Sequence, residues 1–182
     1  YIKYVLVFKN SGKDAGTSIK HTHTQVAALN HIPHLLHEEL EAVKNFSHCP
    51  YCDIINIEKI SFRHCFENSS FVAFTPYASR FNYEIWVFPK KHYTSMVELD
   101  DWEFLELAQI LKKIFNKLKI LNAPYNFFIH NSPHSYNQQN KGMQTLHFHI
   151  EITPRISMCA GLEIGSETFI NIVSPETAAK FY

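Results

Sequence analysis

The sequence predicts an α+β protein with an antiparallel sheet, built from a duplicated unit whose first copy is truncated. A histidine-rich motif occurs twice, at His21–His23 and at His147–His149, and each copy follows a strand and a loop. Between the two motifs, predicted strands flank a long helix, which is the order of an α+β unit. We therefore expect residues 1–46 to be the closing part of a first unit and residues 47–182 to be a complete second unit.

Composition excludes several classes of protein. The chain has 182 residues, in which 17 Lys and Arg balance 17 Asp and Glu, so no positive field favours nucleic acid or an anionic membrane surface. No apolar run approaches the roughly 18–20 residues that span a bilayer, and no signal peptide is recognisable, so we expect a cytoplasmic protein. Because the chain starts at Tyr1 directly before an apolar run, we also expect further protein to precede it.

The first unit contains two strands, a loop and a helix. An apolar run predicts a strand at residues 4–8, and small residues at 9–18 predict a loop whose N–H groups can approach a phosphate. A second strand is expected at residues 20–27, where alternation places three polar side chains on one face: His21, His23 and Gln25. Pro33 and a stripe of leucines then predict a helix through residue 44.

The second unit follows from its hydrophobic pattern. Its predicted elements are a short helix at 53–59, strands at 71–74 and 84–88, a helix at 99–118, strands at 126–130 and 145–153, and a final helix capped by Ser174. A polar loop is predicted at 134–141 and an irregular segment at 160–170. The long helix is amphipathic, and the residues expected in or near its buried stripe are Trp102, Leu105, Leu107, Ile110, Leu111 and Ile114.

Cys49 and Cys52 form a Cys-x-x-Cys pair, which supplies two of the four ligands that zinc prefers. His92 and His147 are the candidates for the other two. A thioredoxin-type redox pair is the competing interpretation, but such a pair ends an early strand in a βαβ unit. Because this pair follows a predicted helix, the sequence favours zinc.

A second metal site is an alternative in the same region. Glu39 and His130 could join His147 and His149 in a set of oxygen and nitrogen ligands that suits iron or zinc. His147 cannot serve both sites fully, so the thiolate site is the first choice. The remaining histidines are expected to be structural or exposed; they are His31, His34, His37, His48, His64 and His134.

His23 is the candidate nucleophile. A neutral imidazole attacks phosphorus well, and the phosphoramidate that results is labile enough to be an intermediate. Gln25 can donate a hydrogen bond to a phosphoryl oxygen as charge develops there, but it cannot act as a general acid. The leaving group should therefore need no proton, which a sugar phosphate with a second pKa of about 6 satisfies.

Three stretches resemble the galactose-1-phosphate uridylyltransferase family, a branch of the histidine-triad superfamily. Val5–Gly12 is similar to its strand and loop VFENKG, and Ser18–Gln25 to its active-site strand S-x-x-H-P-H-x-Q, with Thr22 in place of Pro. Residues 161–171 are similar to its C-terminal substrate loop and closer still to the ADP-glucose phosphorylase-like branch; Leu162 stands where the galactosyl enzymes usually have Tyr.

The resemblance implies roles for individual residues in histidine-triad-like units. His23 would take up the nucleotidyl group with Gln25 beside it, Asn10, Ser18 and Gln25 would bind the substrate phosphates, and Glu163 would hold the sugar phosphate across a homodimer interface. The metal ligands that it implies are Cys49, Cys52, His92 and His147 for zinc, Glu39, His130, His147 and His149 for a second site that could hold iron, and His21 for a zinc site of the first unit.

The resemblance also implies a reaction, in which UMP moves from UDP-glucose to a hexose 1-phosphate in galactose metabolism. The partners would be a nucleoside diphosphate sugar and a sugar 1-phosphate. Two alternatives stay open. One is an ADP-glucose phosphorylase-like adenylyltransferase, and the other is a non-catalytic, zinc-stabilised nucleotide-binding module.

Overall fold

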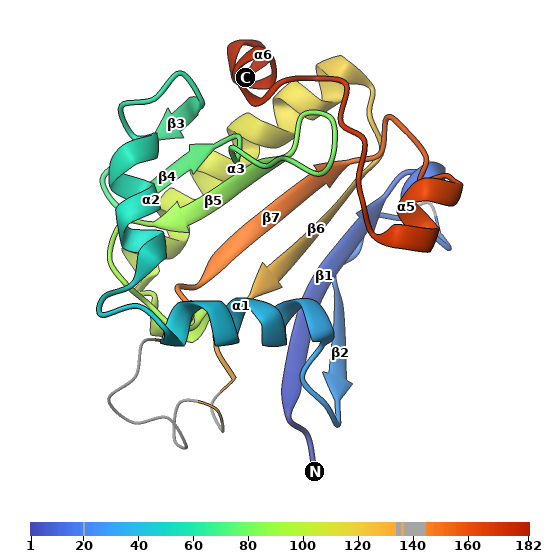
Figure 1. The fold of residues 1–182 in the computed structure, drawn as a ribbon. Helices are drawn as coiled ribbons and strands as arrows, with labels where there is room; N and C mark the ends of the chain where they lie inside the picture. Colours follow the sequence, from blue (N-terminus) through green and yellow to red (C-terminus); the bar gives the residue numbers. More distant parts are fainter. Residues whose placement is uncertain (20, 134–135, 137–144) are drawn as a thin grey trace.

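The computed structural model describes residues 1–19, 21–133, 136 and 145–182, and one antiparallel sheet organises this part of the chain (Figure 1). Its seven strands lie in the order β2-β1-β6-β7-β5-β4-β3. The strands are β1 (Tyr4–Ser11), β2 (Gln25–Leu29), β3 (His64–Glu67), β4 (Phe71–Phe74), β5 (Ile85–Pro89), β6 (Tyr125–His130) and β7 (His149–Pro154). The helices are α1 (His34–Lys44), α2 (Pro50–Glu58), α3 (Asp101–Leu121), α5 (Gly161–Ser166) and α6 (Pro175–Phe181), with short 3-10 turns at Lys13–Ala15 and Met96–Glu98. The predicted α+β class is confirmed.

Helices cover both faces of the sheet. α3 lies along one face and forms the main core with side chains of β4, β5, β6 and β7 (Figure 1). On the opposite face, α1 buries Leu36 and Leu40 beside Tyr4 of β1, and α2 buries Ile55 against Phe74 and Phe88. Because side chains alternate along a strand, the second face also carries His130, His149 and Glu151. His130, His149 and Glu151 therefore lie on the face of the sheet that α1 and α2 cover.

The long helix α3 begins and ends where local chemistry dictates. Asp100 accepts a hydrogen bond from the N–H of Glu103 at 2.8 Å, and the Glu103 carboxylate accepts one from the N–H of Asp100 at 3.0 Å. This capping box starts the helix, and Asn122 ends it in the left-handed conformation. Trp102 and Leu105 lie outside the buried stripe, with exposed fractions of 60% and 49%. The buried row starts one turn later, because the sheet lies under the middle of the helix.

The strand expected at residues 20–27 begins only at Gln25. In the described part of the chain, β2 pairs with β1 alone, and the ladder ends at the pair Phe8–Gln25, after which β1 continues beside β6. His21 and His23 therefore precede the strand. The second motif behaves in the same way, because β7 begins at His149 and leaves His147 before it. Strand propensity cannot show this limit, since it depends on which residues pair with the neighbouring strand.

Several other boundaries differ from the sequence prediction. α2 begins at Pro50, a residue suited to a first helical position, rather than at residue 53. β3 was not predicted, and the segment expected to be irregular contains α5. The loop predicted at 134–141 lies outside the described residues, except for Tyr136.

The two expected units meet within the one sheet. β1 and β2, from residues 1–46, join the strands of residues 47–182 through the pairing of β1 with β6. The boundary between residues 46 and 47 stays a prediction. In the described part of the chain, no helix has the length and the apolar character needed to cross a bilayer.

Candidate functional site

The two histidine motifs share one local geometry. His23 Nδ1 lies 2.8 Å from the carbonyl oxygen of His21, and His149 Nδ1 lies 2.9 Å from the carbonyl oxygen of His147. A carbonyl oxygen can only accept, so Nδ1 carries a proton in each case. The backbone thus holds Nδ1 of the second histidine of each motif and directs its Nε2 away from the main chain.

Burial separates the two copies. His149 is 0% exposed and lies beneath α2, where Tyr51 and Phe88 contact its ring. His23 is only half-buried, and His21 is exposed. A nucleophile must meet its substrate, so only His23 is placed for attack on a molecule that arrives from solvent.

The residues expected near His23 lie on β1, on β2 and in the loop between them. Gln25 pairs with Phe8, so its side chain leaves the same face of the sheet as Phe8 and Asn10. Asn126 holds this region together, because its Nδ2 donates to Asn10 Oδ1 at 2.7 Å and to the carbonyl of Ala15 at 2.8 Å. Ser18 is exposed in the loop that leads to His21. The loop can therefore form one wall of a substrate site.

Four side chains form a cluster that we call the thiolate cluster: Cys49, Cys52, His92 and His147. Their ligand atoms all lie within 4.8 Å of one another. Cys52 Sγ is 3.6 Å from Nδ1 of both histidines. A tetrahedral zinc ion with Zn–S of about 2.3 Å and Zn–N of about 2.0 Å would hold these atoms about 3.5 Å apart. The residues therefore fit zinc.

The surroundings of the thiolate cluster orient its ligands. His147 Nε2 donates to the carbonyl of Pro89 at 2.9 Å, and His92 Nε2 lies 3.2 Å from Thr145 Oγ1, so both Nδ1 atoms are free to face the cysteines. Burial raises the pKa of Cys52 to about 12 and lowers the pKa of His147 to about 3. A thiolate is both the redox nucleophile and the zinc ligand, so this pKa does not separate the two interpretations. The two histidine Nδ1 atoms that face Cys52 favour zinc.

A second group, the carboxylate cluster, lies beside the first: Glu39, His130, His149 and Glu151. His130 Nδ1 is 3.1 Å from a Glu39 oxygen, and His149 Nε2 is 3.6 Å from Glu151 Oε1. The set expected from the sequence included His147, but His147 lies in the thiolate cluster and Glu151 occupies the fourth position. Because β7 starts at His149, His149 and Glu151 point to one face while His147 turns toward the cysteines.

The carboxylate cluster is highly charged and buried. Its His149 Nε2 is buried without a hydrogen-bond partner in the described part of the chain, which fits an atom that awaits a cation. Burial opposes the charged form of Glu151, but the nearby ring of His149 and the charges of His130 and Arg80 lower its pKa to about 2. Arg80, from the β4–β5 loop, forms an ion pair with Glu151. The four residues fit a divalent cation, and Arg80 already balances part of their charge.

Several predicted residues lie apart from these groups. Glu163 caps α5, where its carboxylate accepts from the N–H of Ala160 at 2.9 Å. Among the histidines expected to be structural or exposed, His64 is half-buried, His134 lies outside the described residues, and four are exposed: His31, His34, His37 and His48. Sequence reasoning missed Arg80 and Asn126, for which no local pattern gives a signal. Glu151 is visible in the sequence as the polar residue that follows the second histidine motif, but it was not expected among the metal ligands.

Comparison with known proteins gives a consistent result. Residues 1–180 match the family model DUF4921, described as a domain of unknown function. The chain is 36% identical to an ADP-glucose phosphorylase of Arabidopsis thaliana, over 98% of this chain and 51% of the relative. It is 30% identical to a galactose-1-phosphate uridylyltransferase of Thermotoga maritima, over 99% of this chain and 59% of the relative. The chain therefore spans about half the length of these relatives.

Solved structures agree. The crystal structure of an ADP-glucose phosphorylase from A. thaliana with bound ADP-glucose superposes with a TM-score of 0.88 and 33% identity, over 99% of this chain and 58% of that chain. A zinc-bound histidine triad family protein from Mycobacterium smegmatis gives a TM-score of 0.50 and 17% identity, over 73% of this chain and 88% of that chain, which is a likeness of fold. The predicted histidine-triad-like fold is confirmed. The chain belongs to the DUF4921 family, within the wider group of galactose-1-phosphate uridylyltransferase-like proteins.

Proposed function

We propose that the protein transfers a nucleotidyl group through a covalent intermediate on His23, from UDP-glucose to a hexose 1-phosphate. The geometry of His23 carries this proposal. Its Nδ1 is tied to the carbonyl of His21 at 2.8 Å, and its ring is accessible, unlike that of His149. The names of the relatives support the reaction class.

The chemistry follows from the free lone pair. As His23 Nε2 forms a bond to the α-phosphorus of UDP-glucose, the bond from that phosphorus to the bridging oxygen breaks, and glucose 1-phosphate leaves. A phosphate oxygen of the second sugar phosphate then attacks the same phosphorus and releases the imidazole. The leaving sugar phosphate needs no proton at neutral pH, so no general acid is required beside it. An amide such as Gln25, which cannot donate a proton as an acid, is therefore sufficient at this position. Gln25, Asn10 and Ser18 would donate hydrogen bonds to the phosphoryl oxygens.

Metal ions would serve the fold in this scheme. A zinc ion held by Cys49, Cys52, His92 and His147 would supply a structural cross-link between α2 and the segments that flank β5 and β7. Glu39, His130, His149 and Glu151 would hold a second ion, zinc or iron. His21 would be a ligand of a zinc site in the first unit.

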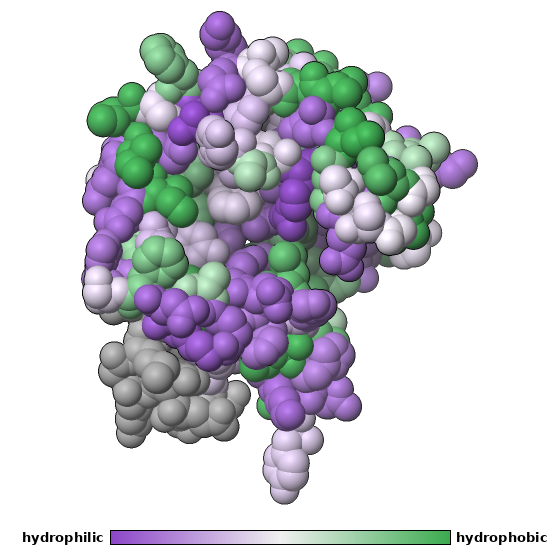
Figure 2. Space-filling model, viewed as in Figure 1, coloured by the Kyte–Doolittle hydropathy of each residue, from purple (hydrophilic) through white to green (hydrophobic). Residues whose placement is uncertain are grey.

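The proposal extends to the assembly. We place the protein in the cytoplasm as a homodimer, in which Glu163 contacts the sugar phosphate bound to the partner. Apolar side chains on and near α5 support this arrangement, because Met158 and Ile164 are 84% and 75% exposed, and Figure 2 shows hydrophobic surface over α5.

An adenylyl-transferring phosphorylase is the second candidate. It is favoured by the 36% identity to the A. thaliana enzyme, and by Leu162 at the position where the galactosyl enzymes usually have Tyr. The same histidine would then carry AMP. A non-catalytic nucleotide-binding module is the third candidate, and it predicts no covalent intermediate at all.

Labelling separates the three candidates. The protein is incubated with UDP-glucose or ADP-glucose labelled in the α-phosphate, and covalent label is measured after denaturation. We expect acid-labile, base-stable label that His23→Asn abolishes, while His34→Asn, a control at an exposed histidine, retains it. Label from UDP-glucose alone supports uridylyl transfer, and label from ADP-glucose alone supports adenylyl transfer. If neither sugar nucleotide labels the protein, the transferase proposal is wrong.

A further inference from the structure

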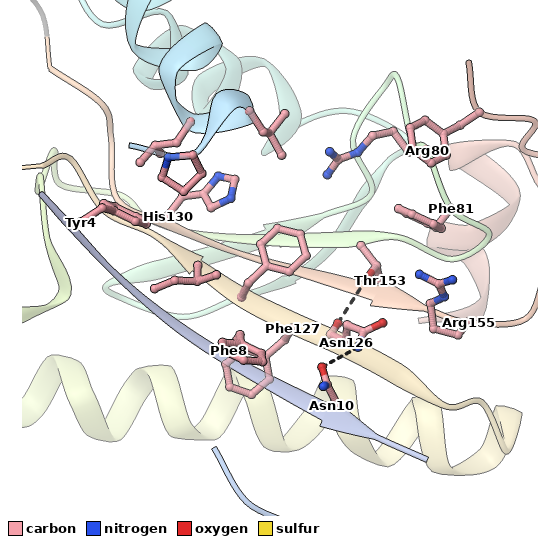
Figure 3. Close-up of a pocket in the computed structure, with 16 residues that line it drawn as sticks. Tyr4, Phe8, Asn10, Arg80, Phe81, Asn126, Phe127, His130, Thr153 and Arg155 are labelled. Carbon is pink, nitrogen blue, oxygen red and sulfur yellow. Dashed lines mark hydrogen bonds between the residues drawn. The ribbon is translucent and has the colours of Figure 1, made fainter. Parts of the chain in front are cut away.

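A cavity of about 420 Å³ lies between the sheet and α1, and it belongs to the nucleotide-sugar site described above (Figure 3). Phe8 and Asn10 line it, on the face of the sheet that also carries Gln25. The three residues assigned to the substrate phosphates are neutral, whereas a sugar phosphate is close to a dianion at neutral pH. Among the described residues that line the cavity there is no Asp or Glu, but there are two arginines, Arg80 and Arg155. The charge that a dianion requires must come from one of these.

The two arginines differ in their partners. Arg80 is committed to the protein, because its Nη2 pairs with carboxylates of Glu84 and Glu151. Arg155 has no such partner in the part of the chain that the structure describes, and its Nε is buried without a hydrogen-bond acceptor. Its Cζ lies 5.3 Å from the ring centroid of Phe81, which offers no oxygen to the N–H groups. A buried cation with an unpaired donor is costly, and an anion in the cavity would remove that cost.

The surroundings hold Arg155 at the wall of the cavity. Its backbone N–H donates to the carbonyl of Pro124 at 2.7 Å, which fixes the start of the side chain. The ring under its guanidinium is fixed as well, because Asn171 Nδ2 donates to the carbonyl of Phe81 at 3.2 Å and Phe169 contacts the Phe81 ring. Arg155 is therefore positioned before a ligand arrives, which lowers the entropic cost of binding.

A row of polar side chains connects Arg155 to Asn10. Asn10 pairs with Asn126 across β1 and β6, and Asn126 pairs with Thr153 across β6 and β7, so the three share one face of the sheet. Asn126 Nδ2 donates to Asn10 Oδ1 at 2.7 Å, so within the described residues the Nδ2 of Asn10 remains for a ligand. Two strand spacings, about 10 Å, separate the backbones of Asn10 and Thr153. Figure 3 shows Arg155 beside this row. The space suits a diphosphate, with one phosphate at Asn10 and the other at Arg155.

Building on the proposed function, we propose that Arg155 is the residue that binds the phosphate of the sugar 1-phosphate. Asn10 donates to the α-phosphate that moves to His23, and Arg155 donates to the neighbouring phosphate. When the bond from the α-phosphorus to the bridging oxygen breaks, the electron pair stays on that oxygen and the departing phosphate gains negative charge. Arg155 stabilises this charge by hydrogen bonds and transfers no proton, because its guanidinium stays protonated. This agrees with a site in which Gln25 cannot act as an acid.

Binding of glucose 1-phosphate to the parent protein, measured by calorimetry without any nucleotide, tests the assignment. We expect Arg155→Gln to weaken this binding by about tenfold to a hundredfold, the range for lost hydrogen bonds from a charged group. Arg155→Lys keeps the charge and should retain part of the affinity. Lys112→Gln, at an exposed position on α3, removes an equal charge outside the cavity and should leave binding unchanged.

The covalent intermediate gives a second readout. Protein labelled at His23 is isolated, and loss of the label is followed with and without glucose 1-phosphate. Arg155→Gln should slow the discharge by subsaturating glucose 1-phosphate by the same factor as it weakens binding. Hydrolysis by water needs no second phosphate, so its rate should equal that of the parent protein. A merely structural role for Arg155 would change both rates.

Three results would overturn the proposal. They are equal affinity for glucose 1-phosphate in the parent and Arg155→Gln proteins, no binding by the parent at millimolar concentration, and binding by Arg155→Lys as weak as by Arg155→Gln with a lowered Tm in both variants. The last result would mean that Arg155 serves the fold. Because the calorimetric experiment forms no covalent bond, it gives its result even if labelling shows that His23 is not a nucleophile. Failure of this assignment and failure of the proposed function are therefore distinguishable.

Discussion

Replacing Gly12 by alanine tests how the loop before His21 is held. Gly12 has φ of 91° and ψ of 155°, a backbone region essentially restricted to glycine, where another residue costs about 1–3 kcal/mol. A Cβ atom at Gly12 would also lie 2.7 Å from Cβ of Pro124, and overpacking of this kind costs about 1–3 kcal/mol. We therefore expect Gly12→Ala to lower the free energy of unfolding by about 2–6 kcal/mol.

Gly16→Ala is the matched control in the same loop. Gly16 has φ of 79° and ψ of 24°, and a Cβ atom there would meet nothing within 4 Å. Alanine at this position should cost only the left-handed strain of about 1–2 kcal/mol. Urea denaturation measures the loss of free energy of unfolding in each variant. In thermal denaturation, each kcal/mol lost should lower Tm by about 2–4 °C for a protein of this size. Equal losses in the two variants would refute the contact with Pro124 as the reason for glycine at position 12.

Two further outcomes are expected. Cys52→Ser should lose the metal of the thiolate cluster, as measured by inductively coupled plasma mass spectrometry after dialysis. Cys65→Ser, the control at a cysteine outside the cluster, should keep that metal. Equal metal content in both variants contradicts the zinc assignment. The hydrogen bond from Lys90 lowers the pKa of Glu67 below its ordinary 4.5, so the stabilisation by Glu67 is present above that pH and is lost as the pH falls through the folded-state pKa. Glu67→Gln should therefore be less stable than the parent protein at pH 7 in urea denaturation. This difference should shrink as the pH falls through the folded-state pKa, and a difference that is unchanged at acid pH argues against this pair.

Local sequence carries much of the fold because helix caps and strand alternation are short-range effects. Asp100 and Glu103 start α3 through their own backbone contacts, and Ser174 caps α6 by accepting from the N–H of Thr177 at 3.2 Å. The extent of a strand is different, because it depends on its neighbour. β2 begins at Gln25, where its pairing with Phe8 of β1 starts, and that pairing is not a local property of the sequence.

The candidate site, like the fold, has parts that the local sequence predicts and parts that it does not. The spacing of Cys49 and Cys52, and of the histidines within each motif, is visible in the sequence because ligands of one site often lie a few residues apart on one element. The partners of those residues are not visible in this way. Cys52 and His147 are separated by 95 positions, and Glu39 and His130 by 91, so only the folded sheet brings them together.

The sequence by itself determined which candidate functional groups this protein contains: two histidine motifs, a cysteine pair and a glycine-bearing loop. Only the tertiary structure decided how that chemistry is distributed. The packing of α2 against the sheet buries His149 and leaves His23 accessible, and the start of β7 sends His147 to the cysteines and Glu151 to the carboxylate cluster. The physical reason is that accessibility and ligand geometry are properties of packed surfaces, and those surfaces form from segments that are distant in the chain.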